Sequence, residues 1–144
     1  SIVDNHRLYN HRSSTENFDI DIEKSVDLIF PALYLAIHNC GVTNIRGIAR
    51  TVHKESNRIL ESTKILDKLG IEYNLCGNSL RVHSNNNWSK ESYKFNSSID
   101  HRCDMLKVMI CLETGGEMDD LKSINKSHPS FIQNLIKCGA IIER

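Results

Sequence analysis

The chain has 144 residues, which is the length of one ordinary domain and is enough to bury a hydrophobic core. Its 18 Lys and Arg residues balance its 18 Asp and Glu residues, so the formal net charge is zero. This balance argues against a nucleic-acid-binding module that depends on bulk positive charge, and no apolar run approaches the ~20 residues that a membrane-spanning helix needs.

The first half of the chain alternates between strand and helix patterns. Residues 1–16 are rich in Asn, His, Arg and Ser, and we expect a loop or the remnant of a preceding unit there. Period-two alternation, apolar runs and glycine stops then predict a strand at 17–22, a helix at 26–39, a strand at 43–48, a helix at 54–69, and a hairpin of strands 71–76 and 79–83.

The same rhythm restarts after a polar turn region at 84–90. The predicted elements are a strand at 93–96, a helix at 101–114, a strand at 118–124, a helix at 130–138 and a strand at 140–143. The order is therefore βαβαββ followed by βαβαβ. We interpret it as two repeat units of one domain, the first at 17–90 and the second at 91–144.

The first helix of each unit indicates how the layers are arranged. Residues 26–39 and 101–114 are apolar nearly all round, which is typical of buried helices. The strands alternate instead, as if one face of each sheet met water. The predicted fold class is therefore α+β, with helices inside and sheets outside, which is the reverse of the usual α/β layout.

Charged residues recur at the predicted helix starts. Asp27 and Asp100 open the first helix of each unit, and Lys54 and Lys126 open the second. A cation at a helix N-terminus opposes the helix dipole unless an anion binds there too. The plain alternatives are that Lys54 and its neighbours form a solvated, salt-bridged helix start and that Lys126 is an exposed loop residue.

A third cation stands at the start of the second buried helix. Asp100 there is explained by N-capping alone. Arg102, which leads into a helix with no polar face, is harder to explain by structure, so we weigh a functional and a structural role about equally. The histidines show no zinc-like spacing with cysteine or carboxylate, and we expect no metal site.

Four short motifs in chain order resemble the C-terminal part of the 5-enolpyruvylshikimate-3-phosphate synthase family. The matching segments are Asp27-Leu28 before Pro31 (Pro-Asp-Leu in the family), Lys-Glu-Ser-Asn-Arg at 54–58 (Lys-Glu-Ser-Asp-Arg), Asp-His-Arg at 100–102, and Lys-Ser-His-Pro-Ser-Phe at 126–131 (Lys-Ser-aromatic-Pro-x-Phe). The resemblance covers about residues 17–144. It implies a fold of βαβαββ units in an inside-out α/β barrel, of which about two units are present.

The resemblance also implies a reaction, in which the enolpyruvyl group of phosphoenolpyruvate moves to the 5-hydroxyl of shikimate 3-phosphate and phosphate leaves. It makes Asp27 the base for the hydroxyl proton and Glu55 the proton shuttle at the methylene carbon. The phosphoenolpyruvate-binding residues would be Arg58, Arg102 and Lys126. The shikimate-3-phosphate-binding residues would be Asp27, Lys54 and Arg50. No cofactor is implied.

The family is a two-domain enzyme far longer than this chain, and its site lies between the domains. We therefore expect a C-terminal fragment that is inactive alone, needs the missing N-terminal domain as its partner, and can self-associate through exposed apolar surface. Asn57, Asp104 and His128 depart from the family pattern. The alternatives are a non-catalytic binding domain on the same scaffold and a UDP-N-acetylglucosamine enolpyruvyl transferase relative.

Five cysteines, without a Cys-x-x-Cys pair or a visible secretory signal, favour a reduced, cytoplasmic compartment. A third alternative, an RNA-end-processing enzyme built of similar repeats, is disfavoured by the neutral charge and the few aromatic residues.

Overall fold

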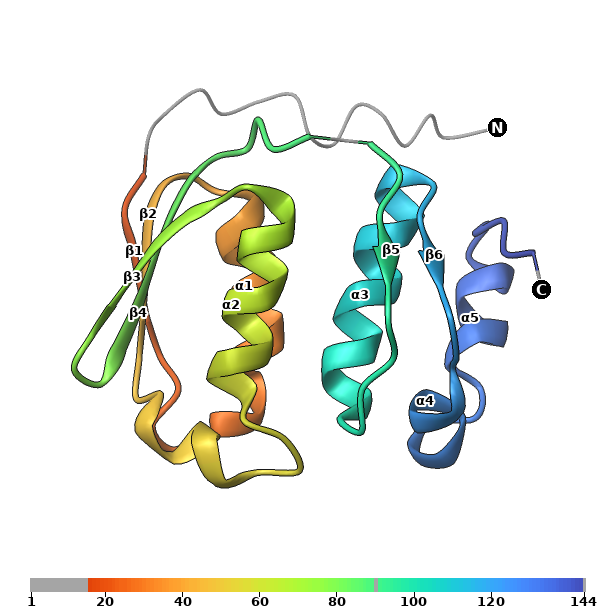
Figure 1. Cartoon of the computed structure of the whole chain (residues 1–144), viewed down its shortest axis with the longest axis horizontal. Coiled ribbons are helices and arrows are strands. Elements are labelled where there is room, and N and C mark those ends of the chain that lie inside the picture. The colour runs from red at the N-terminus through yellow and green to blue at the C-terminus, as the bar shows by residue number, and fades with distance from the viewer. Residues whose placement is uncertain (1–15, 90, 144) are drawn as a thin grey trace.

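The computed structural model describes residues 16–89 and 91–143 (Figure 1). The elements of the first half are β1 (Phe18–Asp21), η2 (Val26–Leu28), α1 (Ile29–His38), β2 (Cys40–Arg46), η3 (Ala49–His53), α2 (Arg58–Leu69), β3 (Glu72–Cys76) and β4 (Ser79–Asn85). Those of the second half are β5 (Lys94–Phe95), α3 (His101–Thr114), β6 (Glu117–Met118), α4 (Lys122–Ser127) and α5 (Phe131–Lys137).

The first half forms a four-stranded sheet with the strand order β1-β2-β4-β3. β1 runs parallel to β2, whereas β4 is antiparallel to both of its neighbours. The hairpin predicted across Gly77-Asn78 is confirmed, and Gly77 supplies the positive φ of 56° that its turn needs. Along β4, Leu80 and Val82 are buried while Arg81 and His83 are exposed, so one face of the sheet meets the core and the other meets solvent.

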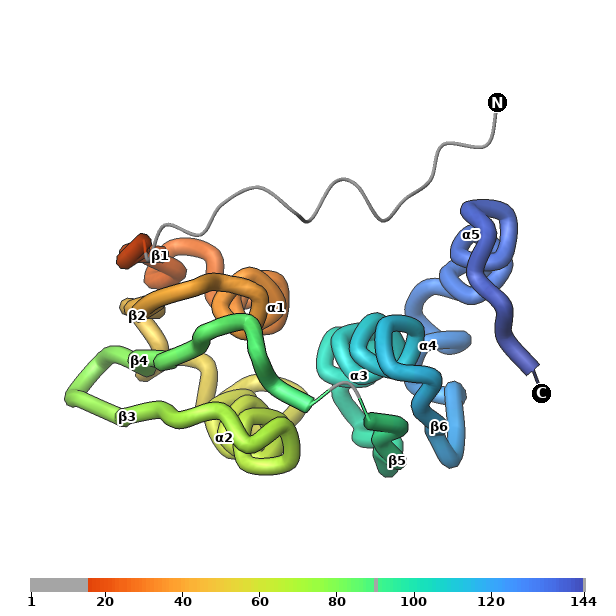
Figure 2. Tube along the Cα trace, turned by 90° about the horizontal axis from the view of Figure 1, so that it is seen from above, coloured from red at the N-terminus to blue at the C-terminus, as the bar shows by residue number. Residues whose placement is uncertain are grey.

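Three helices lie on the inner side of this sheet (Figure 2). α1 and α2 cover the sheet, and α3 packs beside both of them. Side chains from all of these layers meet in one core whose fully buried members include Leu33, Ile37, Ile45, Leu66, Leu80 and Ile110. The prediction that helices lie inside and a sheet outside is thereby confirmed for this half of the molecule.

The first helix is less buried than its composition predicted. Leu35 is 63% exposed and Leu28 is 49% exposed, so one face of this segment is open among the described residues. Pro31 stands in the first turn of α1, where its missing N–H removes no helical hydrogen bond. The apolar pattern thus corresponds to a helix that packs against the rest of the protein on most sides and has one face exposed to solvent.

The second helix begins later than the sequence pattern predicted. Lys54 and Glu55 lie before α2, and Arg58 is its first residue. The reason is local, because the side chain of Asn57 accepts a hydrogen bond from the N–H of Leu60 at 3.2 Å and so caps the helix. The chain just before this point is occupied by the short 3-10 helix η3. Gly70 ends α2 in the left-handed conformation, as expected.

In the described residues 91–143, the strands form a two-stranded sheet in which β5 is parallel to β6. The predicted strand at 118–124 is wrong beyond Met118, because the chain turns at Asp120, whose carboxylate accepts the N–H of Lys122 at 2.7 Å as α4 begins. The predicted strand at 140–143 is also wrong, since this segment pairs with no strand among the described residues. A smaller core of Val108, Ile124 and Ile132 joins these elements.

No helix within residues 16–89 and 91–143 combines the length and the apolar character that crossing a membrane would need.

Candidate functional site

The guanidinium of Arg58 is the centre of the site. Arg58 is the first residue of α2, and its side chain has no exposed surface. Nη1 donates to Oδ1 of Asp27 at 2.6 Å, Nη2 donates to Oε2 of Glu55 at 2.7 Å, and Nε donates to Oδ2 of Asp100 at 2.7 Å. One buried cation therefore joins three carboxylates from separate segments of the chain.

Asp100 fixes this cation from the second half of the molecule. It is the N-cap of α3, as predicted, because its Oδ1 accepts the N–H of Arg102 at 3.1 Å. Its Oδ2 also accepts from Arg58 and, at 3.1 Å, from the hydroxyl of Ser56. The pairing with Arg58 was missed from the sequence. Capping alone already accounts for an Asp at a helix start, so no further signal marked it.

The carboxylate of Asp27 also lies near two further cations on its more exposed side. Besides Arg58, Nζ of Lys54 lies 3.6 Å from its Oδ1 and Nη2 of Arg102 lies 3.4 Å from its Oδ2. The side chains of Asp27, Lys54 and Arg102 are 47%, 35% and 36% exposed. These groups form an open rim above the buried guanidinium, so a ligand from solvent can reach them.

The electrostatics follow from this geometry. The hydrogen bond from Arg58 lowers the pKa of Asp27 below its ordinary value of 3.8 and outweighs the opposing effect of burial, while Arg102 and Lys54 add to the lowering. For Arg58, burial alone would lower the pKa, but the hydrogen bonds to Asp100 and Asp27 outweigh it and raise the pKa. Both groups are therefore charged at neutral pH.

The cluster balances its own charge. Arg58, Lys54 and Arg102 face the carboxylates of Asp27, Glu55 and Asp100. An anion that enters at the rim can replace a carboxylate on the forked guanidinium groups, which suit both carboxylate and phosphate. Within residues 16–89 and 91–143, no group of His, Cys, Asp and Glu side chains has the arrangement to hold a metal ion.

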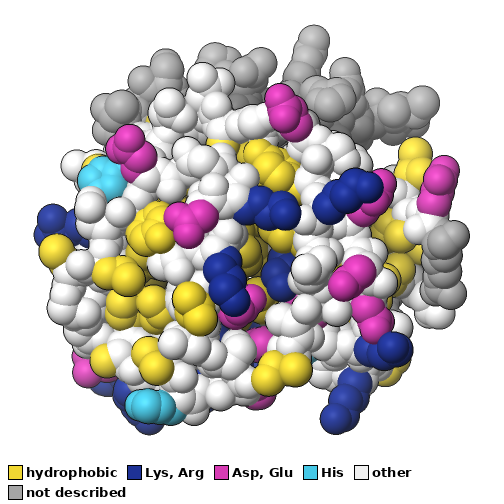
Figure 3. Space-filling model, in the orientation of Figure 1, with side chains coloured by type: hydrophobic (Ala, Val, Ile, Leu, Met, Phe, Trp, Pro, Cys, Tyr) yellow, Lys and Arg dark blue, Asp and Glu magenta, His cyan; other side chains and the backbone are white. Residues whose placement is uncertain are grey.

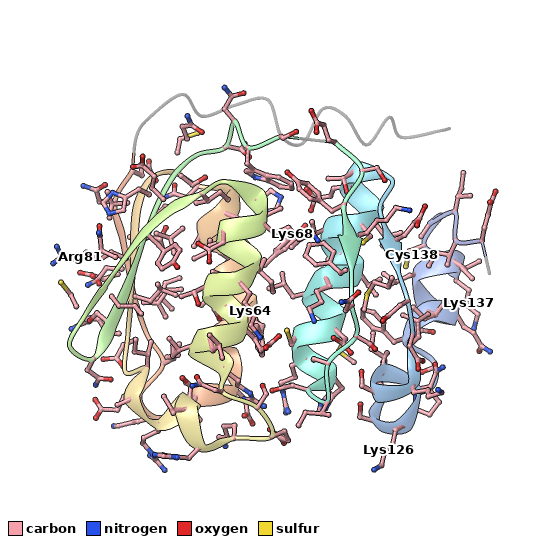
Figure 4. All side chains as sticks on the ribbon, in the orientation of Figure 1. Lys64, Lys68, Arg81, Lys126, Lys137 and Cys138 are labelled. Atoms are coloured by element: carbon pink, nitrogen blue, oxygen red, sulfur yellow. The ribbon has the colours of Figure 1, made fainter. Side chains whose placement is uncertain are left out.

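The structure does not bring every predicted residue together. Lys126 lies in the last turn of α4 and is exposed, so the prediction that it opens a helix is wrong. Its side chain points away from the molecule at the lower end of the view in Figure 4. Arg50 is exposed in η3, and neither residue has an ion pair with the cluster in the described part of the chain. Of the predicted site residues, the cluster thus holds Asp27, Lys54, Glu55, Arg58 and Arg102.

A second buried polar network lies beside the first. Lys107 is 5% exposed, and its Nζ donates to the carbonyl of Asn96 at 2.9 Å and to Oδ1 of Asp104 at 3.1 Å. The fully buried Asp104 also accepts from Ser98 and Ser123. On the surface between α2 and β5, basic and acidic side chains are interleaved (Figure 3). This network ties α3 to α4 and to the segment after β5.

The chain matches the family model for EPSP synthase (3-phosphoshikimate 1-carboxyvinyltransferase) over residues 3–135. A curated 3-phosphoshikimate 1-carboxyvinyltransferase of Sulfurisphaera tokodaii is 26% identical in an alignment that covers 99% of this chain and 35% of that protein. The protein of the same name from Saccharolobus solfataricus is 31% identical over 85% of this chain and 30% of its own length. This chain therefore spans about a third of the length of these relatives.

The fold is similar to a solved structure as well. The EPSP synthase of Acinetobacter baumannii superposes with a TM-score of 0.71 over 85% of this chain and 29% of that one, at 21% identity. This likeness confirms the predicted α+β, inside-out fold class.

Proposed function

Since this chain belongs to the EPSP synthase family, we propose that it forms one wall of the active site of a 3-phosphoshikimate 1-carboxyvinyltransferase. The reaction moves the enolpyruvyl group of phosphoenolpyruvate to the 5-hydroxyl of shikimate 3-phosphate and releases phosphate. The observation that carries the proposal is the cluster around Arg58, in which the guanidinium groups of Arg58 and Arg102 lie 2.6 and 3.4 Å from the carboxylate oxygens of Asp27.

The cluster suits an exchange of anions. Arg58 and Arg102 would bind the carboxylate and phosphate of phosphoenolpyruvate, and Lys54 would bind shikimate 3-phosphate. A cation that binds a ligand no longer pairs with Asp27. The pKa of Asp27 is lowered chiefly by the hydrogen bond from Arg58. The pKa of Asp27 would then rise toward the working pH as the ligands bind.

The two acidic groups at the rim would move the protons. Asp27 would take the proton of the 5-hydroxyl, and Glu55 would shuttle a proton at the methylene carbon of the enolpyruvyl group. Glu55 is held by Arg58 and its side chain is 50% exposed, so it can meet a ligand at the rim. A general base or acid must come within hydrogen-bond reach of the reacting proton, and both carboxylates lie on the accessible side of the buried guanidinium.

The roles of Lys126 and Arg50 rest on the resemblance alone. Both are exposed and outside the cluster. Lys126 would add to the phosphoenolpyruvate site and Arg50 to the shikimate 3-phosphate site when the ligands are bound.

The remaining length of the enzyme, including its N-terminal domain, would supply the facing wall. Preorganised charges stabilise a reacting anion best in a closed site that excludes water, and the rim described above is open. We therefore propose that this chain, with its repeat units at 17–90 and 91–144, is inactive by itself.

A chimera tests the proposal directly. In it, this chain replaces the matching third of the Sulfurisphaera tokodaii relative. We expect the chimera to release phosphate only when both phosphoenolpyruvate and shikimate 3-phosphate are present, and Asp27→Asn to abolish that release. A folded chimera that binds neither substrate by titration calorimetry would contradict the proposal and favour the non-catalytic binding domain.

A further inference from the structure

A groove lies between α2 and the segment that leads from β5 to α3. It has a volume of about 520 Å³, which is large enough for a small organic ligand. Asp27, Arg58 and Arg102 are not among the described residues that line it, so the groove is separate from the candidate active site. Its lining combines charged and apolar side chains, among them Glu61, Lys64, Lys68, Phe95, Ile99 and Lys107.

Lys107 brings a buried ammonium group to this groove. The residue is 5% exposed, and its Nζ donates to the carbonyl of Asn96 at 2.9 Å and to Oδ1 of Asp104 at 3.1 Å. An ammonium group has three N–H donors. The third forms no hydrogen bond with the described residues, and Oε2 of Glu61, at 3.9 Å, is too distant for one. Since a buried donor without a partner costs free energy, a ligand oxygen that accepts from this N–H would be stabilised.

Two further ammonium groups reach the groove from α2. Lys64 and Lys68 are four residues apart and therefore lie on the same face of the helix. Both residues are exposed, and their side chains lie along α2 in Figure 4. The Nζ of Lys68 lies 5.3 Å from the centre of the Phe95 ring, so this side chain extends toward β5. Ammonium groups from α2 and α3 therefore border the same groove.

The charges of the groove do not cancel. Glu61 pairs with Lys64 at 2.9 Å, and Asp104 pairs with Lys107 at 3.1 Å. Lys68 forms no ion pair with the described residues, so among them the three ammonium groups face two carboxylates and one positive charge is left in excess. Low-dielectric walls strengthen the field of such a charge, which favours an anion in the groove.

The groove also offers apolar surface to a ligand. Ile65 and Phe95 line it and are otherwise buried, at 2% and 5% exposure. Ile99 lines it as well but is 78% exposed. A ligand with an apolar part would remove the Ile99 side chain from water, which is favourable, whereas a bare inorganic ion would leave it exposed.

We propose that this groove binds a small phosphate ester, with the phosphate between the ammonium groups of Lys68 and Lys107 and the apolar part of the ester against Ile99. Lysine ammonium groups bind phosphate as point charges and do not need the forked geometry of arginine. The carboxylate of Glu61 lies beside the ammonium groups of Lys64 and Lys107, so it would compete with the phosphate for them. The site takes no part in the reaction proposed above.

Nuclear magnetic resonance of the isotope-labelled 144-residue chain tests this site. The probes are inorganic phosphate and phenyl phosphate, each added at constant ionic strength. The affinity of the groove is taken from the shifts of the backbone amides of Ser97 and Ile99, which line it. The amide of Arg102 reports separately on phosphate bound at the cluster around Arg58.

Three single substitutions are compared with the unsubstituted chain. Lys68→Gln removes the ammonium group that is in excess, and Glu61→Gln removes the competing carboxylate. The matched control is Lys94→Gln, because Lys94 is an exposed lysine of β5 that pairs with Glu117 and is not among the described residues lining the groove. Lys68 and Lys94 are both exposed, so neither substitution should disturb the fold.

We expect saturable shifts of the groove amides with both probes. Lys68→Gln should weaken binding at the groove about fivefold, which is the upper range for an exposed pair of charges. Glu61→Gln should strengthen it, and Lys94→Gln should leave it unchanged. Phenyl phosphate should bind more tightly than inorganic phosphate, because its ring covers Ile99.

Shifts confined to Arg102 and the rest of the cluster around Arg58 would overturn the site. Equal affinities of the groove in the unsubstituted chain, Lys68→Gln and Lys94→Gln would overturn it as well. Inorganic phosphate that binds the groove as tightly as phenyl phosphate would overturn the ester as the ligand. None of these readouts depends on catalysis.

Discussion

Arg58 and Asp100 form an ion pair in which neither side chain has any exposed surface, with Nε of the arginine 2.7 Å from Oδ2 of the aspartate. The arginine begins α2 and the aspartate caps α3, so the pair joins the two halves of the molecule at the candidate site. The same guanidinium holds Asp27 and Glu55, which makes this internal pair the support of the exposed rim.

Breaking this pair should destabilise the whole chain. Asn is as good an N-cap as Asp, so Asp100→Asn keeps the cap of α3 while it leaves Arg58 buried beside a neutral amide. Because Asp27 and Glu55 still pair with Arg58, the change removes one charge-assisted hydrogen bond, and we expect a loss of about 1.5–3 kcal/mol in the free energy of unfolding, measured by urea denaturation. The control is Asp120→Asn in the exposed pair with Lys122, which should cost less than about 1 kcal/mol. Equal losses of unfolding free energy in the two variants would show that the buried pair stabilises the chain no more than an exposed pair does.

The pair of Asp104 and Lys107 should behave as a coupled unit. Replacing Lys107 by Met leaves a fully buried carboxylate without its cation, and replacing Asp104 by Ala leaves the cation without its carboxylate. Each single change should be strongly destabilising. The double change should cost clearly less than the sum of the two, by about 0.5–3 kcal/mol in a double-mutant cycle of unfolding free energies. Additive losses would mean that the two groups act independently.

Stability should depend on Asp27 in a defined pH range. The hydrogen bond from Arg58 lowers the pKa of Asp27 below 3.8, so the folded chain binds this proton less readily than the unfolded chain does. The contribution is fully present above the unfolded pKa and disappears as the pH falls through the lower, folded pKa. Urea unfolding from pH 7 down to pH 2 should therefore show a constant gap between wild type and Asp27→Asn that closes below about pH 4. A gap that widens in acid would reverse this assignment.

Asn57 should tolerate the aspartate that the family has at this position. Its side chain caps α2 through the N–H of Leu60, and Asp caps as well and carries a charge that suits a helix N-terminus. We expect Asn57→Asp to leave the unfolding midpoint in urea unchanged or slightly raised. Asn57→Ala, which removes the cap, should cost about 1 kcal/mol. A large loss for Asn57→Asp would point to a role outside capping.

Two of the three departures from the family pattern, Asn57 and Asp104, make structural hydrogen bonds. Asn57 caps a helix, and Asp104 bonds to Lys107, Ser98 and Ser123 away from the rim. Among the described residues, neither side chain forms a hydrogen bond or an ion pair with Asp27, Glu55 or Arg58. They therefore give no reason to doubt the proposed chemistry of Asp27 and Glu55.

The long, strongly patterned elements could be predicted from the sequence. The helix at 101–114 was placed to the residue, because Asp100 caps it and Gly115 ends it with a φ of 71°. The hairpin was equally clear from Gly77-Asn78. The ends of the helix and the turn of the hairpin are determined by residues at those positions, so they can be predicted from the sequence.

The short elements of the second half could not be predicted, because their state depends on neighbours. Residues 140–143 read as a strand, yet a strand exists only when another strand pairs with it. The segment after Met118 has an apolar pattern that suits a strand or a short helix, and the turn at Asp120 decides for the helix.

The candidate site could be predicted only in part, because some of its contacts join residues far apart in the sequence. The motifs that contain Asp27, Glu55, Arg58 and Arg102 do come together in space. The pairing of Arg58 with Asp100 spans 42 positions of sequence and was not foreseen. The sequence pattern places Lys54 and Lys126 at helix starts, and both lie elsewhere, because α2 begins at Arg58 and α4 begins at Lys122.

The most direct measurement of the central claim is the KM for phosphoenolpyruvate of two chimeras, one with Arg102→Gln and one with Arg46→Gln. Both arginines are partly exposed and near an aspartate, but only Arg102 lies at the rim of the cluster. We predict that Arg102→Gln raises the KM about tenfold or more, since a hydrogen bond to a charged group contributes about 1.5–3 kcal/mol, and that Arg46→Gln leaves it unchanged. Equal KM values in the two variants and the unsubstituted chimera would contradict the claim that this cluster binds the anionic substrate.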